Sequence, residues 1–284
     1  MPSLLLERVT SNAIGRGLFN LARPTVEWAS RKLNPELPPD RKWIKVKSNG
    51  RTFALEVRRR STDYSMIRQC FTLNQYEIEI ELGELGQRTR KFYEEILQSG
   101  RKPLIVDCGA NIGASCCWFS ARYPEAHILA VEPVASNFEL LRKNTKGLDI
   151  DLRQAGIGAE NSFASLSVQP EGIYCANYLK SHDGPGGVEV LSLQTLLSDK
   201  PASQFAPFLL KIDIEGGERA LFSRDPAGYD RFPVIVMEPH DWMFPGELTS
   251  RDFFRFHVEA GREFMMSNEN VVSIALERRA SSAT

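Results

Sequence analysis

The sequence predicts an α/β protein whose mostly parallel, doubly wound sheet is closed by an antiparallel hairpin. From Lys102 onward, short apolar runs alternate with helical stretches, which is typical of parallel strands joined by helices. The chain then ends on REFMMSNENVVSIALE, two alternating segments around a turn. We divide the 284 residues into a helical N-terminal extension (1–40), a hairpin and helical lead-in (41–100) and a ligand-binding domain (101–280).

The first hundred residues lack the strand–helix alternation. Residues 1–35 read as helical and end near the proline-rich NPELPP. WIKVKSNGRTFALEVRR predicts a hairpin, because Asn-Gly favours a tight turn between two alternating segments. Residues 62–99 are expected to be mostly helical, with Ser-Gly at 99 and 100 as the stop signal.

Five apolar runs account for the parallel sheet. PLIVDCG, AHILAVEP and IDLRQAGIG predict the first three strands, separated by the helices IGASCCWFSARYP and VASNFELLRKNTKG. Residues 163–195 interrupt this rhythm and predict an inserted hairpin and a short helix. PFLLKIDIE and FPVIVMEPH then predict the fourth and fifth strands, followed by the helix SRDFFRFHVEAG.

Charge and cysteine content limit the class of protein. A formal net charge of -1 argues against a nucleic-acid binder, although residues 1–60 hold 13 Lys/Arg against 5 Asp/Glu. That basic segment is either a solvated flank or a surface for an acidic substrate, a partner or an anionic membrane. The five cysteines have no zinc-binding spacing, which indicates reduced thiols in a cytoplasmic protein without a structural metal.

No apolar run is long enough to span a membrane, and the amino terminus lacks the features of a secretory signal. Leu4, Leu5, Val9 and Ile14 instead lie on one stripe of an amphipathic helix. We expect this stripe to pack on the chain's own domain or on a second subunit of a homo-oligomer.

The stretch VDCGANIGAS, which follows the first strand and opens a helix, predicts a ligand site. Gly109 and Gly113 allow a close backbone approach, and the helix amino terminus offers free N–H groups. Asn111 replaces the central glycine of the G-x-G-x-x-G pattern, and Asp107 precedes the glycines. An acid at that place suits an ammonium or hydroxyl group better than a diphosphate.

Glu132 ends the second strand, 19 residues beyond Gly113, where an acid can accept hydrogen bonds from both ribose hydroxyls. Together with Asp107 it favours S-adenosylmethionine, which carries an amino-acid tail and a ribose but no phosphate, over a nicotinamide cofactor. Gly156 and Ile157 end the third strand, where small residues could flank an adenine. A strand-to-helix turn without a ligand remains the alternative.

Three stretches together resemble the FkbM family of S-adenosylmethionine-dependent methyltransferases. They are VDCGANIGASCCWFSARYPEAHILAVEPVASNFELLRKN, VEVLSLQTLL and LLKIDIEGGE, and RRRSTDYSMIRQCFTLNQYE resembles the family's lead-in. The resemblance covers roughly residues 55–240 and implies a Rossmann-like class I methyltransferase fold. It also implies O-methylation of sugar or natural-product hydroxyls.

The resemblance implies a set of cofactor contacts: Tyr76, Asp107, Gly109, Asn111, Gly113 and Glu132. Gln75 stands where an acid often precedes the tyrosine in that family, so that one contact departs from the pattern. Asn137 is expected to cap or brace its helix.

LLKIDIEGGE places charged residues around a Gly-Gly pair at the end of the fourth strand. Asp213, Glu215 and, past the fifth strand, His240 are candidate catalytic groups, because methyl transfer to a hydroxyl needs alignment and a proton acceptor. His240 could be the base, since its unperturbed pKa of about 6.5 suits neutral pH. Lys211 could form a structural ion pair with Asp213 or Glu215.

A divalent metal held by Asp213, Glu215 and Glu238 is a less favoured reading, and we expect no metal ligands. Glu218 reads as a first-turn acid stabilised by the helix dipole rather than a functional group. The sequence therefore predicts an S-adenosylmethionine-dependent O-methyltransferase with a small-molecule or glycan acceptor. An N-methyltransferase and a non-catalytic nucleotide-binding scaffold remain alternatives.

Overall fold

The computed structural model describes residues 40–81, 83–168, 177–182, 187–223 and 226–278. The helix expected over residues 1–35, and with it the suggested oligomer contact, lies outside these ranges. The predicted division of the chain into three parts stays a prediction. In the described residues, no helix has both the length and the apolar character needed to cross a membrane.

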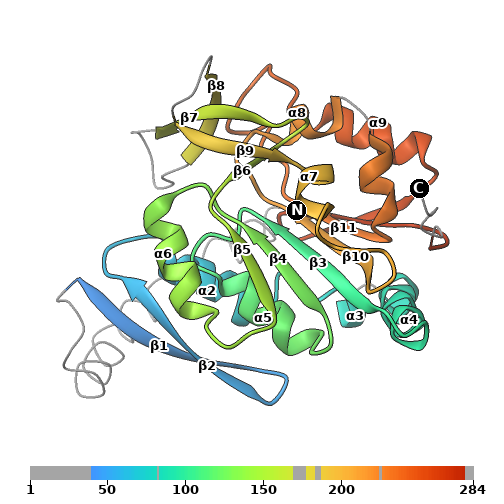
Figure 1. Ribbon diagram of the computed structural model, residues 1–284, viewed down its shortest axis with the longest axis horizontal. Helices are drawn as coiled ribbons and strands as arrows, with labels where there is room; N and C mark the ends of the chain where they lie inside the picture. Colours follow the sequence, from blue (N-terminus) through green and yellow to red (C-terminus); the bar gives the residue numbers. More distant parts are fainter. Residues whose placement is uncertain (1–39, 82, 169–176, 183–186, 224–225, 279–284) are drawn as a thin grey trace, which may run out of the picture.

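A seven-stranded sheet forms the centre of the molecule (Figure 1). Its strands, in spatial order, are β12 (Glu263–Ser267), β13 (Asn270–Ile274), β11 (Val234–Met237), β10 (Phe205–Ile212), β3 (Lys102–Cys108), β4 (His127–Val131) and β5 (Ile150–Arg153). The run from β11 to β5 is parallel, whereas β13 pairs antiparallel with β11 and with β12. The predicted parallel sheet with a closing antiparallel hairpin is confirmed.

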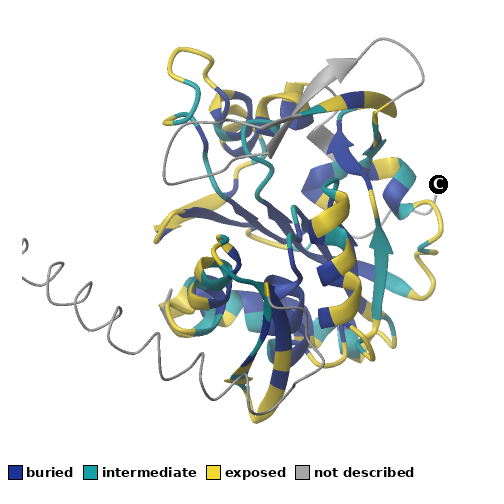
Figure 2. Cartoon of the chain, turned by 90° about the vertical axis from the view of Figure 1, so that its left-hand side faces the viewer, coloured by how far each residue is buried: buried dark blue, intermediate teal, exposed yellow. Residues whose placement is uncertain are grey.

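Both faces of the middle of this sheet are covered, which explains why β3, β4, β10 and β11 are largely continuous apolar runs. Alternate residues of β3 enter different cores: Ile105 packs with α5 (Ala114–Arg122), and Val106 packs on the opposite face. The first core also contains α2 (Asp63–Phe71), α4 (Gly83–Gln98) and α6 (Ala135–Asn144). The second contains α7 (Leu193–Leu197), α8 (Glu218–Ser223), η1 (Pro226–Arg231) and α9 (Arg251–Glu259). Figure 2 shows the buried strands between these layers.

The lead-in packs against the first core. Strands β1 (Arg41–Ser48) and β2 (Arg51–Arg58) form the predicted hairpin, with positive φ angles at Asn49 and Gly50. Asn144 of α6 ties the hairpin down: its amide oxygen accepts from the Glu56 backbone N–H at 2.7 Å. The expected helical stretch consists of α2, α3 (Ile78–Glu81) and α4.

A second, four-stranded sheet accounts for the interruption after the third strand. Its order is β6 (Gly156–Gly158), β9 (Val188–Ser192), β7 (Ser162–Val168) and β8 (Asn177–His182). The sequence predicted one strand over IDLRQAGIG, and this is wrong. Strand β5 of the central sheet ends at Arg153. The backbone groups of Gly156–Gly158 pair instead with Val190–Ser192 of β9, in the second sheet.

Candidate active site

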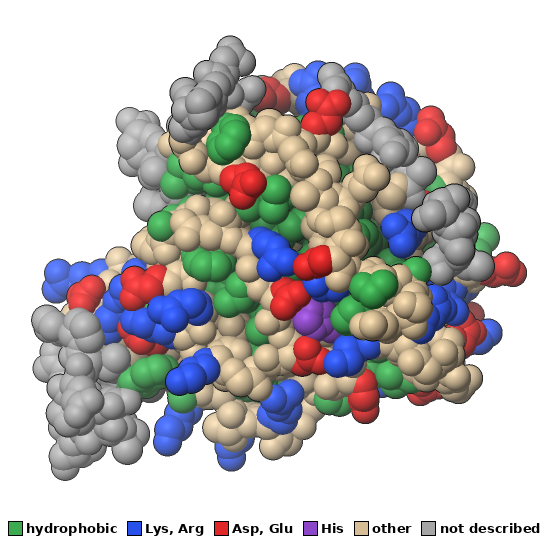
Figure 3. Space-filling view, in the orientation of Figure 1, with side chains coloured by type: hydrophobic (Ala, Val, Ile, Leu, Met, Phe, Trp, Pro, Cys, Tyr) green, Lys and Arg blue, Asp and Glu red, His purple; other side chains and the backbone are tan. Residues whose placement is uncertain are grey.

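The candidate site lies where the chain reverses its direction across the central sheet. From β3 the chain continues outward to β4 and β5, and it later returns to β10 on the other side of β3. Open α/β sheets bind ligands at such a switch point, outside the carboxyl ends of the strands. Figure 3 shows acidic, basic and histidine side chains gathered near the middle of the face seen in Figure 1.

The glycine turn after β3 is held in a conformation that other residues rarely adopt. Gly109 has a φ of +81°, and a Cβ there would lie 1.8 Å from the backbone oxygen of Asp213. Asn111 also has a positive φ, of 49°, and Gly113 has a φ of +87° with Leu141 packed against it. The turn therefore brings the backbone of β3 directly against the end of β10, as the glycine spacing predicted.

Asp107 lies on β3 directly opposite Lys211 on β10, and the two form a buried ion pair. Lys211 Nζ lies 3.2 Å from Asp107 Oδ1 and 3.4 Å from Asp213 Oδ2, and it donates to the Gly109 carbonyl oxygen at 2.8 Å. Asp107 Oδ2 accepts from the Ser115 hydroxyl at 2.6 Å. Asp107 is thus enclosed, and its predicted contact with the cofactor's amino-acid tail stays a prediction.

Glu132, at the end of β4, is oriented by its neighbours. Its Oε2 accepts from the Asn111 backbone N–H at 2.9 Å, and its Oε1 accepts from the Asn137 side-chain amide at 3.2 Å. Asn137 in turn accepts from the Arg58 guanidinium at 2.7 Å, and Arg58 pairs with the fully buried Asp63. The expected bracing role of Asn137 fits these contacts, and the lead-in motif RRRSTD acts through them on Glu132.

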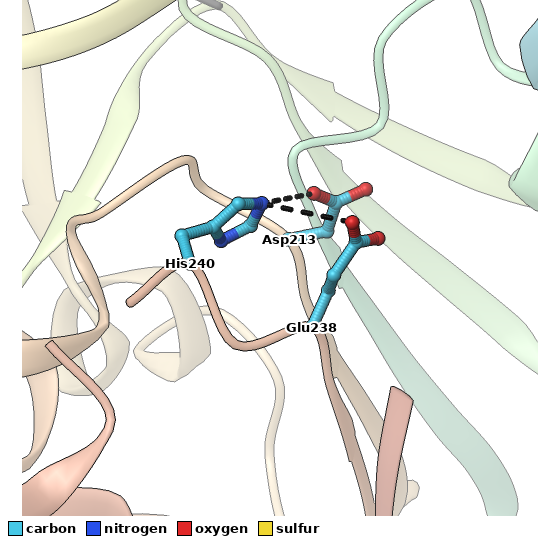
Figure 4. Close-up of side chains that lie close together, drawn as sticks. All are labelled: Asp213, Glu238 and His240. Atoms are coloured by element: carbon cyan, nitrogen blue, oxygen red, sulfur yellow. Dashed lines mark ion pairs between the residues drawn. The ribbon is translucent and has the colours of Figure 1, made fainter. Parts of the chain in front are cut away.

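Three side chains converge beyond the ends of β10 and β11: Asp213, Glu238 and His240 (Figure 4). One potential ligand atom from each lies within 4.8 Å of the others. His240 Nε2 is 3.7 Å from Asp213 Oδ1 and 3.8 Å from Glu238 Oε1. On the other edge of the ring, Nδ1 is 2.7 Å from Glu218 Oε1. We call Asp213, Glu238 and His240 the acidic triad.

Burial and charge shift several pKa values at the site. Burial by itself lowers the pKa of His240, but its hydrogen bond to Glu218 and the surrounding carboxylates outweigh burial and raise that pKa to about 9. Burial and the charge of Asp213 raise the pKa of Glu238 to about 8. His240 therefore carries a proton at neutral pH in this structure, and the argument for a base from its unperturbed pKa does not hold here.

The remaining predicted residues lie around this centre. Tyr76 is buried, with its ring centroid 5.2 Å from that of Phe119. Gly156 and Ile157 are buried in β6. Glu215 follows β10 with a positive φ of 52° and is not part of the acidic triad. Whether any of these contacts a ligand stays a prediction.

Sequence reasoning missed Glu218 and Arg58. Glu218 does begin a helix, as predicted, but its side chain is fully buried and bonds His240 and the Gly216 backbone N–H. Arg58 was one of three consecutive arginines, and no local pattern distinguishes the one that reaches Asn137. An acid directly after a Gly-Gly pair was the one signal for Glu218 that the sequence offers.

Comparison with known proteins agrees with these features. The model of the Methyltransferase FkbM domain matches residues 107–260, more than half of the chain. "Methyltransferase 1" of Beauveria bassiana (strain ARSEF 2860) is 27% identical over 157 residues, 47% of this chain and 63% of that protein. "Methyltransferase sdnD" of Sordaria araneosa is 45% identical over 42 residues, 15% of this chain and 16% of that protein. The chain thus spans less than two thirds of the length of either relative.

Solved structures show more distant similarity. The methyltransferase FkbM from Methylobacillus flagellatus KT has a TM-score of 0.41 and 15% identity, over 61% of this chain and 43% of that one. The N-terminal domain of human METTL16, crystallised with S-adenosylhomocysteine (SAH), has a TM-score of 0.39 and 12% identity, over 82% and 88%.

The strand order and the site at its switch point define a Rossmann-like, class I methyltransferase domain that uses S-adenosylmethionine. On the family match over residues 107–260, the chain belongs to the FkbM methyltransferase family.

Proposed function

We propose that the protein transfers a methyl group from S-adenosylmethionine to a hydroxyl of a sugar, a glycan or another natural product. The observation that carries this proposal is the acidic triad at the ends of β10 and β11, beside the Asp107–Lys211 pair and the glycine turn. Oxygen nucleophiles need a partner for the proton that they lose, and the triad offers the Asp213 carboxylate beside His240 as that partner.

The proposed reaction is a direct displacement. A lone pair of the acceptor oxygen forms a bond to the methyl carbon, and the electrons of the carbon–sulfur bond pass to sulfur. This converts S-adenosylmethionine into SAH. The proton of the acceptor hydroxyl leaves through the acidic triad. In this proposal Asp213 lies on the cofactor side, because its Oδ2 pairs with Lys211, and His240 lies on the acceptor side.

The cofactor would bind along the carboxyl ends of β3 and β4. Glu132 would accept from the ribose hydroxyls, and the turn containing Gly109, Asn111 and Gly113 would pass close to the amino-acid tail. The acceptor class is supported by the resemblance of the chain to the FkbM family, and a cytoplasmic location stays a prediction. Trp242, with 61% of its surface exposed, is suited to stack on a sugar ring.

The first test is calorimetric titration of the purified chain with S-adenosylmethionine, SAH and NAD in parallel. We expect saturable micromolar binding of the two adenosyl ligands and none of NAD. Glu132→Gln should weaken both by about 10-fold or more, because the remaining amide accepts fewer hydrogen bonds from the ribose. Asp199→Asn, an exposed acid paired with Arg153, is the matched control and should bind normally.

A second test identifies the acceptor. The chain is incubated with methyl-labelled S-adenosylmethionine and panels of sugars, glycosides and amines, and labelled products are analysed by mass spectrometry. Label on oxygen supports the proposal, and label only on nitrogen would replace it with the N-methyltransferase alternative. Tight cofactor binding without transfer to any panel would favour the scaffold alternative.

A further inference from the structure

We infer that Asp213, Glu238 and His240 bind one divalent cation such as Mn²⁺, and that this cation holds the acceptor hydroxyl for methyl transfer. The second half of this inference rests on the proposed function, whereas the cation site stands on the geometry of the three side chains. Carboxylate oxygens and an imidazole nitrogen together suit a divalent first-row metal.

The spacing of the acidic triad fits a shared ion better than hydrogen bonds. Distances of 3.7 and 3.8 Å from His240 Nε2 to Asp213 Oδ1 and Glu238 Oε1 are too long for hydrogen bonds. Ligands about 2.1 Å from one metal ion lie about 3.0 to 3.5 Å from each other. The two distances from Nε2 thus exceed this range by a few tenths of an ångström, and all three candidate ligand atoms lie within 4.8 Å of one another, so small inward movements would let the three side chains bind one ion.

The histidine is already oriented for this role. Glu218 accepts a hydrogen bond from His240 Nδ1 at 2.7 Å, which fixes the ring and leaves Nε2 facing the two carboxylates. Among the described residues Nε2 has no hydrogen-bond partner, although His240 is only 3% exposed. A carboxylate behind a histidine is the usual support of a metal-binding imidazole.

The local charge also favours a cation. Four carboxyl groups are linked through this part of the site by contacts with two cationic side chains, Lys211 and His240. They are Asp107, Asp213, Glu218 and Glu238. Lys211 contacts Oδ2 of Asp213, so that Oδ1 of the same carboxylate faces His240. Asp107 and Glu218 are buried and pair with these two cationic side chains, whereas the partly buried Asp213 and Glu238 are the acids that a bound cation would neutralise.

A second histidine–acid cluster in the same chain provides a contrast. His127 lies 2.7 Å from Asp149 and 3.4 Å from Asp151, but each acid also contacts a lysine within 2.7 Å. Lys102 and Lys200 thus supply the positive charge there, and more than a third of each acid's side chain is exposed. We expect no cation at the His127 cluster, which makes Asp151→Asn a matched control.

A cation at the triad would change the fate of the hydroxyl proton. The ion would bind the acceptor oxygen and lower the pKa of its hydroxyl, and the proton would pass to solvent water. The oxygen would then form its bond to the methyl carbon while the carbon–sulfur bond breaks toward sulfur. Binding of the ion would release the proton on His240 Nε2, and the proton of the Glu238 carboxyl group, to water. Asp213, Glu238 and His240 would then act as ligands and not as the base.

The test measures the cation directly. The full chain is treated with EDTA, exchanged into metal-free buffer and titrated with Mn²⁺, with free Mn²⁺ followed by its electron paramagnetic resonance signal. We expect one saturable site per chain, with a nitrogen modulation of the bound-ion signal from the imidazole. Glu238→Gln and His240→Gln should weaken binding at least 10-fold, and His240→Gln should abolish the nitrogen modulation. Asp151→Asn should bind normally.

Two outcomes would overturn the inference: no saturable Mn²⁺ binding by the unaltered chain, or binding that survives in both triad variants. Circular dichroism and SAH titration of the same samples show whether each variant folds. These titrations also separate the two proposals. SAH binding without Mn²⁺ binding would leave the proposed function standing and refute the cation site. Mn²⁺ binding without SAH binding would do the reverse.

Discussion

Replacing Lys211 with methionine should be among the most destabilising single changes in the described chain. Methionine keeps most of the apolar stem of the lysine and removes its charge. Lys211 is 2% exposed and Asp107 is fully buried, so the substitution leaves a buried carboxylate without its cation. Breaking a buried ion pair from one side costs about 3–5 kcal/mol.

The neighbours of Asp107 place the expected cost near the lower end of that range. The carboxylate keeps hydrogen bonds from Ser115 and Cys116, which continue to stabilise its negative charge. The Gly109 carbonyl oxygen loses its bond from Lys211. We therefore expect the free energy of unfolding to fall by about 3 kcal/mol for Lys211→Met.

Urea unfolding followed by circular dichroism measures this change, and two further variants make it decisive. Asp107→Asn combined with Lys211→Met removes both charges and should recover most of the loss, because no uncompensated charge remains buried. Lys102→Met removes a lysine whose partner Asp149 is about half exposed, and it should cost about 1 kcal/mol or less. A cost for Lys211→Met no greater than that of Lys102→Met would refute the reasoning.

Three other predictions concern the turn, the second core and the thiols. Gly109→Ala should weaken SAH binding at least 10-fold, because its Cβ would overlap the Asp213 backbone oxygen, whereas Gly147→Ala has open space and should bind normally in the same titration. His257 is fully buried and its pKa is lowered to about 4 by burial and by Arg262. The stability that the neutral His257 side chain contributes is therefore complete above pH 6.5 and is lost as the pH falls toward 4. In urea unfolding, the free energy of unfolding of the unaltered chain should fall by about 2–3 kcal/mol more than that of His257→Gln over this interval. Burial raises the pKa of the four described cysteines, to about 12 for Cys117; they are Cys70, Cys108, Cys116 and Cys117. A thiol reagent should therefore label these four thiols at least 100-fold more slowly in native protein than in urea. Fast labelling of any of them in native protein, located by mass spectrometry, would contradict this prediction.

Most of the helices and strands could be predicted from the sequence, because local patterns identify them. Apolar runs of strand length, the Asn-Gly turn and the alternating terminal segments each identify an element without knowledge of its neighbours. The exception is Gly156–Gly158, whose partner β9 lies more than 30 residues away in the chain. Pairing between distant segments leaves no local signal, so the sequence predicted the inserted hairpin but not that Gly156–Gly158 joins it in a second sheet.

The candidate site residues also fall into those that local patterns indicate and those that depend on how the chain folds. Asp107 and Glu132 could be named as candidates because strand ends and glycine turns mark the nucleotide edge of such a sheet, and their contact with the cofactor stays a prediction. The triad was found in part: Asp213 and His240 were named, but Glu238 was grouped with Glu215 in the metal reading. Which acids meet depends on how the chain turns after β10, where Glu215 adopts a positive φ. That turn is decided by tertiary packing.

Asp213 connects the two halves of this site through its two carboxylate oxygens. Oδ2 contacts Lys211, which also holds Asp107 and the carbonyl of the glycine turn, whereas Oδ1 faces His240. The Asp213 backbone N–H also bonds the Cys108 carbonyl oxygen, so its position follows the end of β3. A change in charge at His240 therefore acts, through this one residue, on Lys211 and the glycine turn, which form the proposed cofactor side. Cofactor binding and acceptor binding should consequently be coupled, and Asp213→Asn should weaken that coupling more than Glu238→Gln, whose side chain contacts the acceptor side alone.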